Sequence, residues 1–314
     1  MLPSTTRSVR FSTGAVALAA AGRTAEPTAR AGAPREVSIS AHWLIAAILA
    51  DTVATAGTTP DDGGVHGYHD ASYGEAFADV YDDWYGPGSD LGDPAVAARF
   101  LAPLAAGGRA LELGVGTGRL ALPLADMGVE VHGVDSSAAM LARLAAKPGG
   151  AAVHTAVADM VDGLPAGPFA LVFVAYNTLF NLPTEERQQE CFRQVAARLA
   201  SAGGAFVVEA FVPAVGDASA DAPSGVSVRS MTATQVVLSV HRSDAGGQRA
   251  EGQYVQFTEA GGVRLRPWSI RWATVAQLDE MAASAGLHVA ERWADYERTP
   301  FGPDSPRHVT VYRR

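Results

Sequence analysis

An acidic residue and three glycines lie close together in this chain, at Glu112, Gly114, Gly116 and Gly118. Apolar residues precede and separate them, so the pattern predicts a short buried strand and then a turn that opens a helix. Glycines at such a turn permit positive φ angles and let a bulky nucleoside approach the main chain. A dinucleotide fingerprint would place its third glycine at position 119, where this chain has Arg119. The pattern therefore favours a nucleoside site and weakens the case for a nicotinamide oxidoreductase.

Further polar residues end the strands that follow. Asp135, with Ser136 after it, ends the predicted strand 130–135, where a carboxylate can accept hydrogen bonds from both hydroxyls of a ribose. The predicted strands 152–157 and 169–174 run into two more short segments, which are Asp159-Met160 and Ala175-Tyr176. Ligands of open α/β sheets bind outside the carboxyl ends of the strands. We therefore expect all of these residues at one edge of a sheet.

In this order, over roughly 70 residues, the signals resemble the motifs of the class I S-adenosylmethionine (SAM) methyltransferases. The resemblance implies that Asp135 binds the ribose, that Asp159 and Met160 contact the adenine, and that the turn 114–118 binds the methionine moiety. It also implies that an aromatic helical segment, 73–85, closes over the cofactor. The cofactor residues implied in this way are Tyr81, Glu112, Gly114, Gly116, Gly118, Asp135, Ser136, Asp159, Met160 and Ala175.

Three residues are predicted on the acceptor side of the site, and no metal ligand is predicted. Glu209 interrupts an apolar strand near its carboxyl end, where it could hold an acceptor ammonium, take its proton, or form a structural salt bridge. His308 begins the last predicted strand and could be a general base or a structural residue. We expect Glu209 and His308 to border one cavity. Tyr176 follows the fourth strand. Adenine and glutamine methyltransferases carry prolines at this place, and this chain has none there, so adenine and glutamine are disfavoured as acceptors.

The elements that must position these residues alternate between strands and helices. Besides the four strands, the patterns predict helices at 94–104, 119–127, 137–144, 184–200 and 275–285, a strand at 205–211, and a final hairpin of 287–293 and 309–313. The fold expected is α/β, with a Rossmann-like seven-stranded class I methyltransferase sheet.

Residues 213–272 are extra to that fold, and alternating segments at 235–242, 253–257 and 263–272 predict a small inserted antiparallel sheet. Its position after the fifth strand suggests a lid, an acceptor wall or a dimer contact, so a homodimer is a further expectation. Four of its arginines could bind an acceptor carboxylate or form a solvated face; they are Arg229, Arg264, Arg266 and Arg271.

Composition narrows the function classes. The chain has 314 residues, 48% of them hydrophobic, and a formal net charge of −9. An acidic chain lacks the clustered lysines and arginines that neutralise nucleic-acid phosphates, and no apolar stretch approaches the ~18 residues of a membrane span. The single cysteine, Cys191, excludes an internal disulfide and fits a cytoplasmic protein.

Residues 1–65 are rich in Ala, Thr, Gly and Arg and predict a disordered leader before a domain at 66–314. Their apolar run 14–21 imitates a signal peptide but consists mainly of alanine, which disfavours export.

The whole of 66–314 resembles bacterial tailoring enzymes of natural-product pathways, among them amino-sugar N-methyltransferases and the N-methyltransferases of linaridin-type peptides. The resemblance implies methyl transfer from SAM to an amine or hydroxyl of a small metabolite or peptide, in secondary metabolism. A catalytically silent SAM-binding protein, acting as a partner or sensor, is the alternative from another class.

Overall fold

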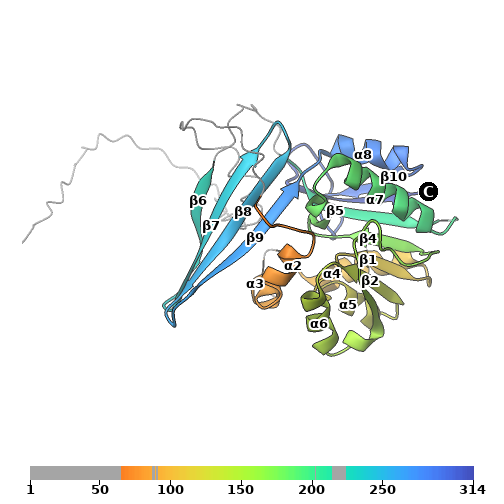
Figure 1. Cartoon of the computed structure of the whole chain (residues 1–314). Coiled ribbons are helices and arrows are strands. Elements are labelled where there is room, and N and C mark those ends of the chain that lie inside the picture. Colours follow the sequence, from red (N-terminus) through yellow and green to blue (C-terminus); the bar gives the residue numbers. More distant parts are fainter. Residues whose placement is uncertain (1–64, 87–88, 90, 202, 214–223) are drawn as a thin grey trace, which may run out of the picture. The chain divides into compact units, whose positions relative to one another are not determined.

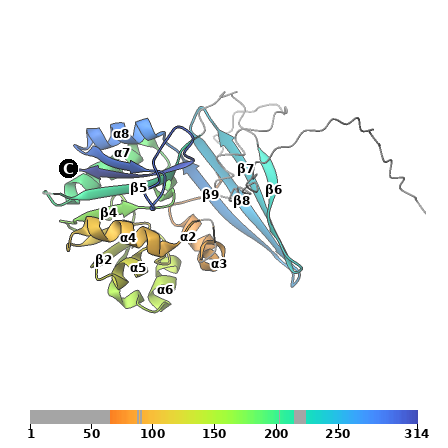
Figure 2. The same cartoon turned by 180° about the vertical axis from the view of Figure 1, so that it is seen from behind.

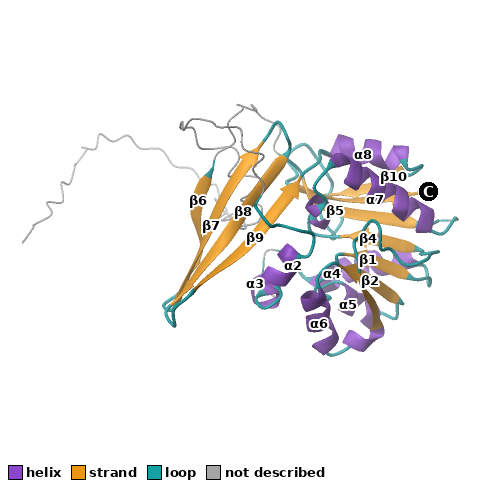
Figure 3. Ribbon diagram, viewed as in Figure 1, coloured by secondary structure: helices purple, strands orange, loops and turns teal. Residues whose placement is uncertain are grey.

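Seven strands form the central sheet, in the order β10-β11-β5-β4-β1-β2-β3 (Figures 1 and 3). The computed structural model of the protein describes residues 65–86, 89, 91–201, 203–213 and 224–314, so all but the last residue of the predicted leader lies outside it. The strands are β1 (Ala110–Leu113), β2 (Val131–Asp135), β3 (Val153–Val157), β4 (Leu171–Val174), β5 (Ala205–Phe211), β10 (His288–Trp293) and β11 (Arg307–Arg313). β11 pairs antiparallel with both of its neighbours, β10 and β5, and the other pairs in this sheet are parallel. The predicted Rossmann-like sheet is confirmed.

Helices cover both faces of this sheet (Figure 2). The strands β1, β4 and β5 are therefore buried along their whole length. One apolar cluster joins the sheet to α4 and α5, and the other joins it to α7 and α8. Side-chain caps begin four of the helices, as the sequence rules for helix starts lead one to expect. The helices are α4 (Pro94–Ala105), α5 (Ala121–Asp126), α6 (Ala138–Ala146), α7 (Glu185–Arg198) and α8 (Val275–Ser284). None of the described helices is long and apolar enough to cross a membrane.

The aromatic segment predicted as one helix over 73–85 forms two short ones, α2 (Ser72–Phe77) and α3 (Tyr81–Tyr85). The break at 78–80 turns Asp79 toward the inserted sheet, where its carboxylate accepts hydrogen bonds from Arg264 and Arg266. The prediction missed the break because the partners of Asp79 lie far away in the sequence.

The inserted sheet has four antiparallel strands in chain order. They are β6 (Gly225–Met231), β7 (Gln235–Asp244), β8 (Arg249–Thr258) and β9 (Val263–Arg271). Three of them were predicted, and β6 was not. The ladder between β6 and β7 shifts register between Val228 and Ser230, so Arg229 is the extra residue of a β-bulge. The inner face of this sheet packs against α2 through β9.

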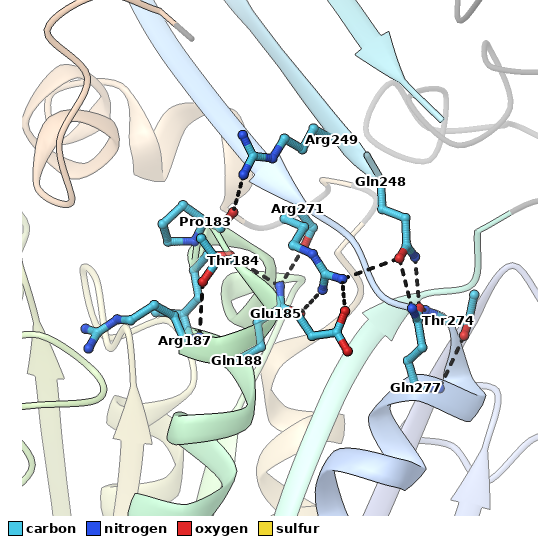
Figure 4. A network of polar contacts seen from close by, with 11 residues as sticks. Pro183, Thr184, Glu185, Arg187, Gln188, Gln248, Arg249, Arg271, Thr274 and Gln277 are labelled. Atoms are coloured by element: carbon cyan, nitrogen blue, oxygen red, sulfur yellow. Dashed lines mark hydrogen bonds and ion pairs between the residues drawn. The ribbon is translucent and has the colours of Figure 1, made fainter. Parts of the chain in front are cut away.

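A buried arginine fixes the inserted sheet to α7 (Figure 4). Arg271, at the end of β9, donates hydrogen bonds to Gln188 Oε1 at 2.9 Å and to Glu185 Oε2 at 2.6 Å. The amide of Gln188 donates in return to the backbone carbonyl of Arg271 at 2.6 Å. A second link joins Gln248, which precedes β8, to Gln277 of α8. These contacts give the inserted sheet a fixed attachment.

The other face of the inserted sheet, here called the outer face, is apolar and exposed. Up to Val240, Gln253 and Pro267, register and side-chain alternation place twelve side chains on it, and all of them except Gln253 are apolar. Beyond them the same face continues with Arg242, Glu251 and Ser269. Seven of the ten large apolar side chains that are exposed among the described residues belong to it. The twelve are Val226, Val228, Met231, Val236, Leu238, Val240, Gln253, Val255, Phe257, Val263, Leu265 and Pro267.

Candidate active site

A pocket opens at the carboxyl ends of β1, β2 and β3, where the sequence predicted a ligand site. It contains about 700 Å³ of space, including the part open to solvent, which is within the range of small-molecule sites. Seven of the ten predicted cofactor residues line it, namely Tyr81, Gly114, Gly116, Asp135, Ser136, Asp159 and Met160. Glu112, Gly118 and Ala175 do not line it. Tyr73 and Gly74, from the segment 73–85 that was predicted to close over the cofactor, also line it. The other lining residues were not predicted as site residues, and they are Asp70, Val134, Met140, Ala158, Thr178, Asn181 and Leu182.

The turn after β1 requires its glycines. Gly114 has φ +69°, and a Cβ built there would lie 2.4 Å from Cγ2 of Thr178. Gly118 has φ +82°, and its Cβ would lie 2.9 Å from Leu144. Side chains at either position would be strained by the backbone conformation and would collide with a neighbour. The absent side chains thus leave the main chain of the turn open to the pocket.

Asp135 holds this turn in place from the end of β2. Its Oδ2 accepts a hydrogen bond from Gly116 N at 2.8 Å, and its Oδ1 accepts one from Ser137 N at 2.8 Å. Burial raises the pKa of this carboxyl, while the two backbone hydrogen bonds act in the opposite direction. Each carboxylate oxygen has a second lone pair, so Asp135 can still accept hydrogen bonds from a ligand.

Glu112 lies buried beneath the same turn. Burial raises its pKa to about 8, although the nearby Arg119 lowers it, and Asp135 adds to the rise. Its Oε2 has no hydrogen-bond partner among the described residues. A buried acceptor without a partner is costly, so this oxygen suits a ligand that carries a positive, hydrogen-bond-donating group.

Aromatic rings form another part of the pocket wall. Tyr73 and Tyr81 line it, and the ring of Tyr81 lies 4.8 Å from that of Tyr85. Tyr85 forms a hydrogen bond with Tyr73, and its ring lies 6.0 Å from that of Tyr176. Burial raises the pKa of each of these four tyrosines, so their hydroxyls stay neutral at physiological pH.

Behind these rings the β-bulge directs Arg229 into a cage of three aromatic side chains. Its guanidinium carbon lies 4.6 Å from the ring centre of Trp84, 4.8 Å from that of Tyr254 and 5.5 Å from that of Tyr85. Cation–π attraction of this kind fixes the guanidinium in place. Arg266 also lies over the ring of Trp84, 5.5 Å from its centre, and forms an ion pair with Asp79.

Comparisons with known proteins agree with this geometry. A family profile described as "Methyltransferase domain" matches residues 110–203. The chain is 30% identical, over 211 residues, to the cypemycin N-terminal methyltransferase of a Streptomyces species, a match that covers 65% of this chain and 82% of that protein. It is 41% identical to the solved CcbJ methyltransferase from Streptomyces caelestis, with 78% of this chain and 99% of that chain covered and a TM-score of 0.72.

The chain belongs to the class I SAM-dependent methyltransferases. Its cofactor is accordingly SAM. A SAM-bound structure of CalS10, an amino pentose methyltransferase from Micromonospora echinaspora, shares the fold at 24% identity, with 75% of this chain and 97% of that chain covered and a TM-score of 0.56. The pocket fits SAM, because Asp135 offers acceptors to the ribose. Glu112 does not line the pocket, but its unpartnered Oε2 lies beneath the glycine turn that does and suits the ammonium.

On the acceptor side of this methyltransferase, the expectation that Glu209 and His308 border one cavity is wrong. The register of β5 and β11 pairs Glu209 with Val309 and His308 with Ala210. Because side chains alternate along a strand, the two project from opposite faces of the sheet. Neither of them lines the pocket.

The contacts of Glu209 and His308 are structural ones. Glu209 Oε2 accepts hydrogen bonds from Tyr176 N and from the Tyr296 hydroxyl, both at 3.1 Å. His308 Nδ1 lies 2.8 Å from Thr310 Oγ1, and burial lowers the pKa of the imidazole to about 3. The hydrogen bond from Tyr176 N to Glu209 holds the backbone of Tyr176 in place.

Tyr176 reaches the site indirectly. It does not line the pocket, but its ring faces Tyr85, whose hydrogen-bond partner Tyr73 does. Its φ of +51° is unusual for a bulky residue, and the bond from its N–H to Glu209 holds it there. The sequence gives no signal for this backbone conformation.

Proposed function

We propose that this methyltransferase transfers the methyl group of SAM to an amine of a small metabolite or peptide in natural-product tailoring. The relatives support the tailoring role, since one is named for an N-terminal methylation and another as an amino pentose methyltransferase. The observation that carries the choice of an amine is the aromatic part of the pocket wall, where the tyrosine hydroxyls stay neutral and offer no base. A hydroxyl acceptor needs a base more than an amine does, and neither predicted base lines the pocket.

On this proposal the cofactor lies along the edge of the sheet with its ribose at Asp135 and its adenine at Asp159 and Met160. Asp159 Oδ1 accepts hydrogen bonds from Val161 N and from Arg187, which fixes this loop. Glu112 receives the ammonium group, and the hydroxyl of Tyr81 is directed to the carboxylate. The cofactor, when bound, supplies a methyl group made electrophilic by its sulfonium.

The protein's own contribution is alignment, exclusion of water and control of the acceptor's charge. Tyr73 and Tyr81, both partly buried, line the pocket and limit the access of water. The amine's lone pair forms the new nitrogen–carbon bond as the carbon–sulfur bond breaks, with its electrons remaining on sulfur. The nitrogen then loses a proton to water.

Arg229 supports the aromatic part of the pocket wall. Its guanidinium contacts Tyr85, the ring that adjoins both pocket tyrosines, Tyr73 and Tyr81. The rings of Trp84 and Tyr254 also lie against it. Solvent can deprotonate an amine before it binds, so the acceptor needs no side chain to remove its proton before attack.

Mass spectrometry of products from an acceptor panel with methyl-labelled SAM tests this function. The panel contains short peptides with a free N-terminal amine, amino sugars, and matched N-acetylated and hydroxyl-only compounds. We expect the added label on amines and none on the N-acetylated partners.

Two outcomes would contradict the proposal. Label found only on hydroxyl compounds would make the enzyme an O-methyltransferase. Calorimetric binding of SAM, without turnover of any acceptor to S-adenosylhomocysteine, would favour the catalytically silent SAM-binding protein.

A further inference from the structure

Two histidines and a glutamate gather at the amino ends of β2 and β3, away from the pocket. They are Glu130, His132 and His154, and each offers one nitrogen or oxygen atom that lies within 4.8 Å of those of the other two. None of the three lines the pocket. The methyl transfer therefore does not account for this group of side chains.

The register of β2 and β3 brings the two histidines together. His132 and His154 are the second residues of parallel neighbouring strands, and they pair directly with each other. Their ring centres lie 4.8 Å apart. The pocket opens at the other ends of these strands, so three residues of β2, or about 10 Å, separate His132 from Asp135. No metal ligand was predicted here, since the pairing depends on a register between two strands.

His132 is held in place from within the protein. Its ring lies against the buried ring of Phe169, with centres 5.5 Å apart and planes at 72°. Its Nε2 lies 2.9 Å from Oε1 of Glu130, and this hydrogen bond lowers the pKa of Glu130, so the carboxyl is ionised at neutral pH. The charge of Arg109 also acts on Glu130, but the carbonyl of Pro168 holds that guanidinium at 3.0 Å. The side chain of Glu130 is 53% exposed, so a cation can reach it from solvent.

The distances suit a small divalent cation. Two ligand atoms of one tetrahedral Zn²⁺ lie about 3.3 Å apart, given bonds of about 2.0–2.1 Å. The atoms of Glu130 and His132, at 2.9 Å, are close to that separation. The side chain of His154 is exposed, so rotation of its ring can bring the third ligand atom to the same distance. The cation takes the position of the hydrogen between Glu130 and His132, and the imidazoles bind it in their neutral form.

The donor atoms select the kind of metal. Two imidazole nitrogens and one carboxylate oxygen form a donor set that suits Zn²⁺ and the neighbouring transition metals. Mg²⁺ and Ca²⁺ prefer ligand sets made of oxygen alone. Three protein ligands leave one position of a tetrahedral ion for water.

We propose that Glu130, His132 and His154 bind one divalent transition-metal ion of the zinc class, which joins β3 to β2. β3 is an outer strand of the central sheet, and four of its five residues are exposed. Few packing contacts therefore hold this strand, and a shared metal ion adds a link between its only histidine and the rest of the sheet. The site is independent of the proposed acceptor, because it lies at the ends of the strands opposite the pocket.

Calorimetric titration of Zn²⁺ into the full chain, without a histidine tag and after treatment with EDTA, tests the site. We expect one Zn²⁺ per chain with a Kd at or below about 10 µM. His154→Gln and Glu130→Gln should each weaken this binding at least tenfold. His288→Gln is the matched control, because His288 is an exposed histidine on β10, the outer strand at the other side of the same sheet. It should leave the binding unchanged.

Hydrogen–deuterium exchange of the amides of β3 gives an independent readout. An ion that joins the two strands makes local opening of β3 less frequent. We expect Zn²⁺ to slow the exchange of residues 153–157 in the wild type and not in His154→Gln.

Three results would overturn the proposal. The first is a wild-type chain that binds no Zn²⁺ at about 100 µM. The second is binding that remains equally tight in both glutamine variants, because the ion would then lie elsewhere in the chain. The third is binding that depends on His154 but leaves the exchange of β3 unchanged, because the ion would then not join the strands. Circular dichroism and SAM binding of each variant establish that it is folded.

Discussion

The carboxylate of Asp135 accepts a hydrogen bond at 2.8 Å from the backbone N–H of Gly116, joining the end of β2 to the turn after β1. One side chain thereby fixes the turn and still has lone pairs directed at the pocket. The two roles are linked, because a ligand bound to Asp135 meets a turn that Asp135 itself holds in place.

We expect Asp135→Ala to weaken SAM binding by roughly 1.5–3 kcal/mol, the scale for losing hydrogen bonds to a charged group. Isothermal titration calorimetry measures the change. Asp126→Ala is the control, since Asp126 is exposed at the end of α5. An unchanged affinity in Asp135→Ala would remove Asp135 from the cofactor site.

Gly114→Ala should reduce SAM affinity by more than tenfold, because the added Cβ combines positive φ with a clash against Thr178. Gly128→Ala separates the two effects, since Gly128 has φ +85° and nothing within 4 Å of its Cβ position. It should lower the unfolding temperature slightly and leave SAM binding intact. Thr178→Ser added to Gly114→Ala removes the methyl group that clashes, so it should restore part of the affinity. No restoration would mean that φ alone is responsible.

The pH dependence of stability reports on Glu112. Its pKa is raised to about 8 in the folded protein, from 4.5 when exposed. The folded state therefore binds more protons than the unfolded state between these values, so the free energy of unfolding falls as pH rises from about 5 to 8. Urea titrations across that range should show the fall in the wild type and a smaller one in Glu112→Gln. A wild-type stability that rises over the same range would contradict a neutral buried Glu112.

Arg229 is tested by the stability of the rings around it. We expect Arg229→Gln to lower the free energy of unfolding by about 1–2 kcal/mol, because its contacts with Trp84, Tyr85 and Tyr254 are lost. Arg229→Lys keeps a cation and should lose less. Urea unfolding measures both changes. A stability unchanged in Arg229→Gln would contradict a supporting role for these contacts.

His308→Ala should leave the pH profile of kcat unchanged, since His308 projects away from the face that carries Glu209. Loss of a buried side chain should still lower stability by about 1–3 kcal/mol, measured by urea unfolding. A changed pH profile would return His308 to the list of candidate bases.

The central sheet could be predicted because its signals are local. Acids and glycines at strand ends, such as Glu112 and Asp135, mark both the strands and the edge where ligands bind. The acceptor side depends instead on register between β5 and β11, which are distant in the sequence. A shift of one residue moves a side chain to the other face, and this is why Glu209 and His308 could not be placed.

The bulge at Arg229 escaped prediction for a related reason. The seven residues of β6 mix apolar residues with serine and arginine, and an extra residue in one strand is visible only once its partner strand is known. The cage around Arg229 likewise gathers rings from α3 and β8, about 170 positions apart.

The two faces of the inserted sheet alternate residue by residue, as with Tyr254 on the inner face and Val255 on the outer face. Single substitutions can therefore alter the inner face, which carries Tyr254, while sparing the outer face, which carries Val255, and the reverse. A one-residue insertion or deletion within a strand has the opposite effect, because it exchanges the faces of everything beyond it. We expect natural length variation in this segment to be confined to the turns between the strands.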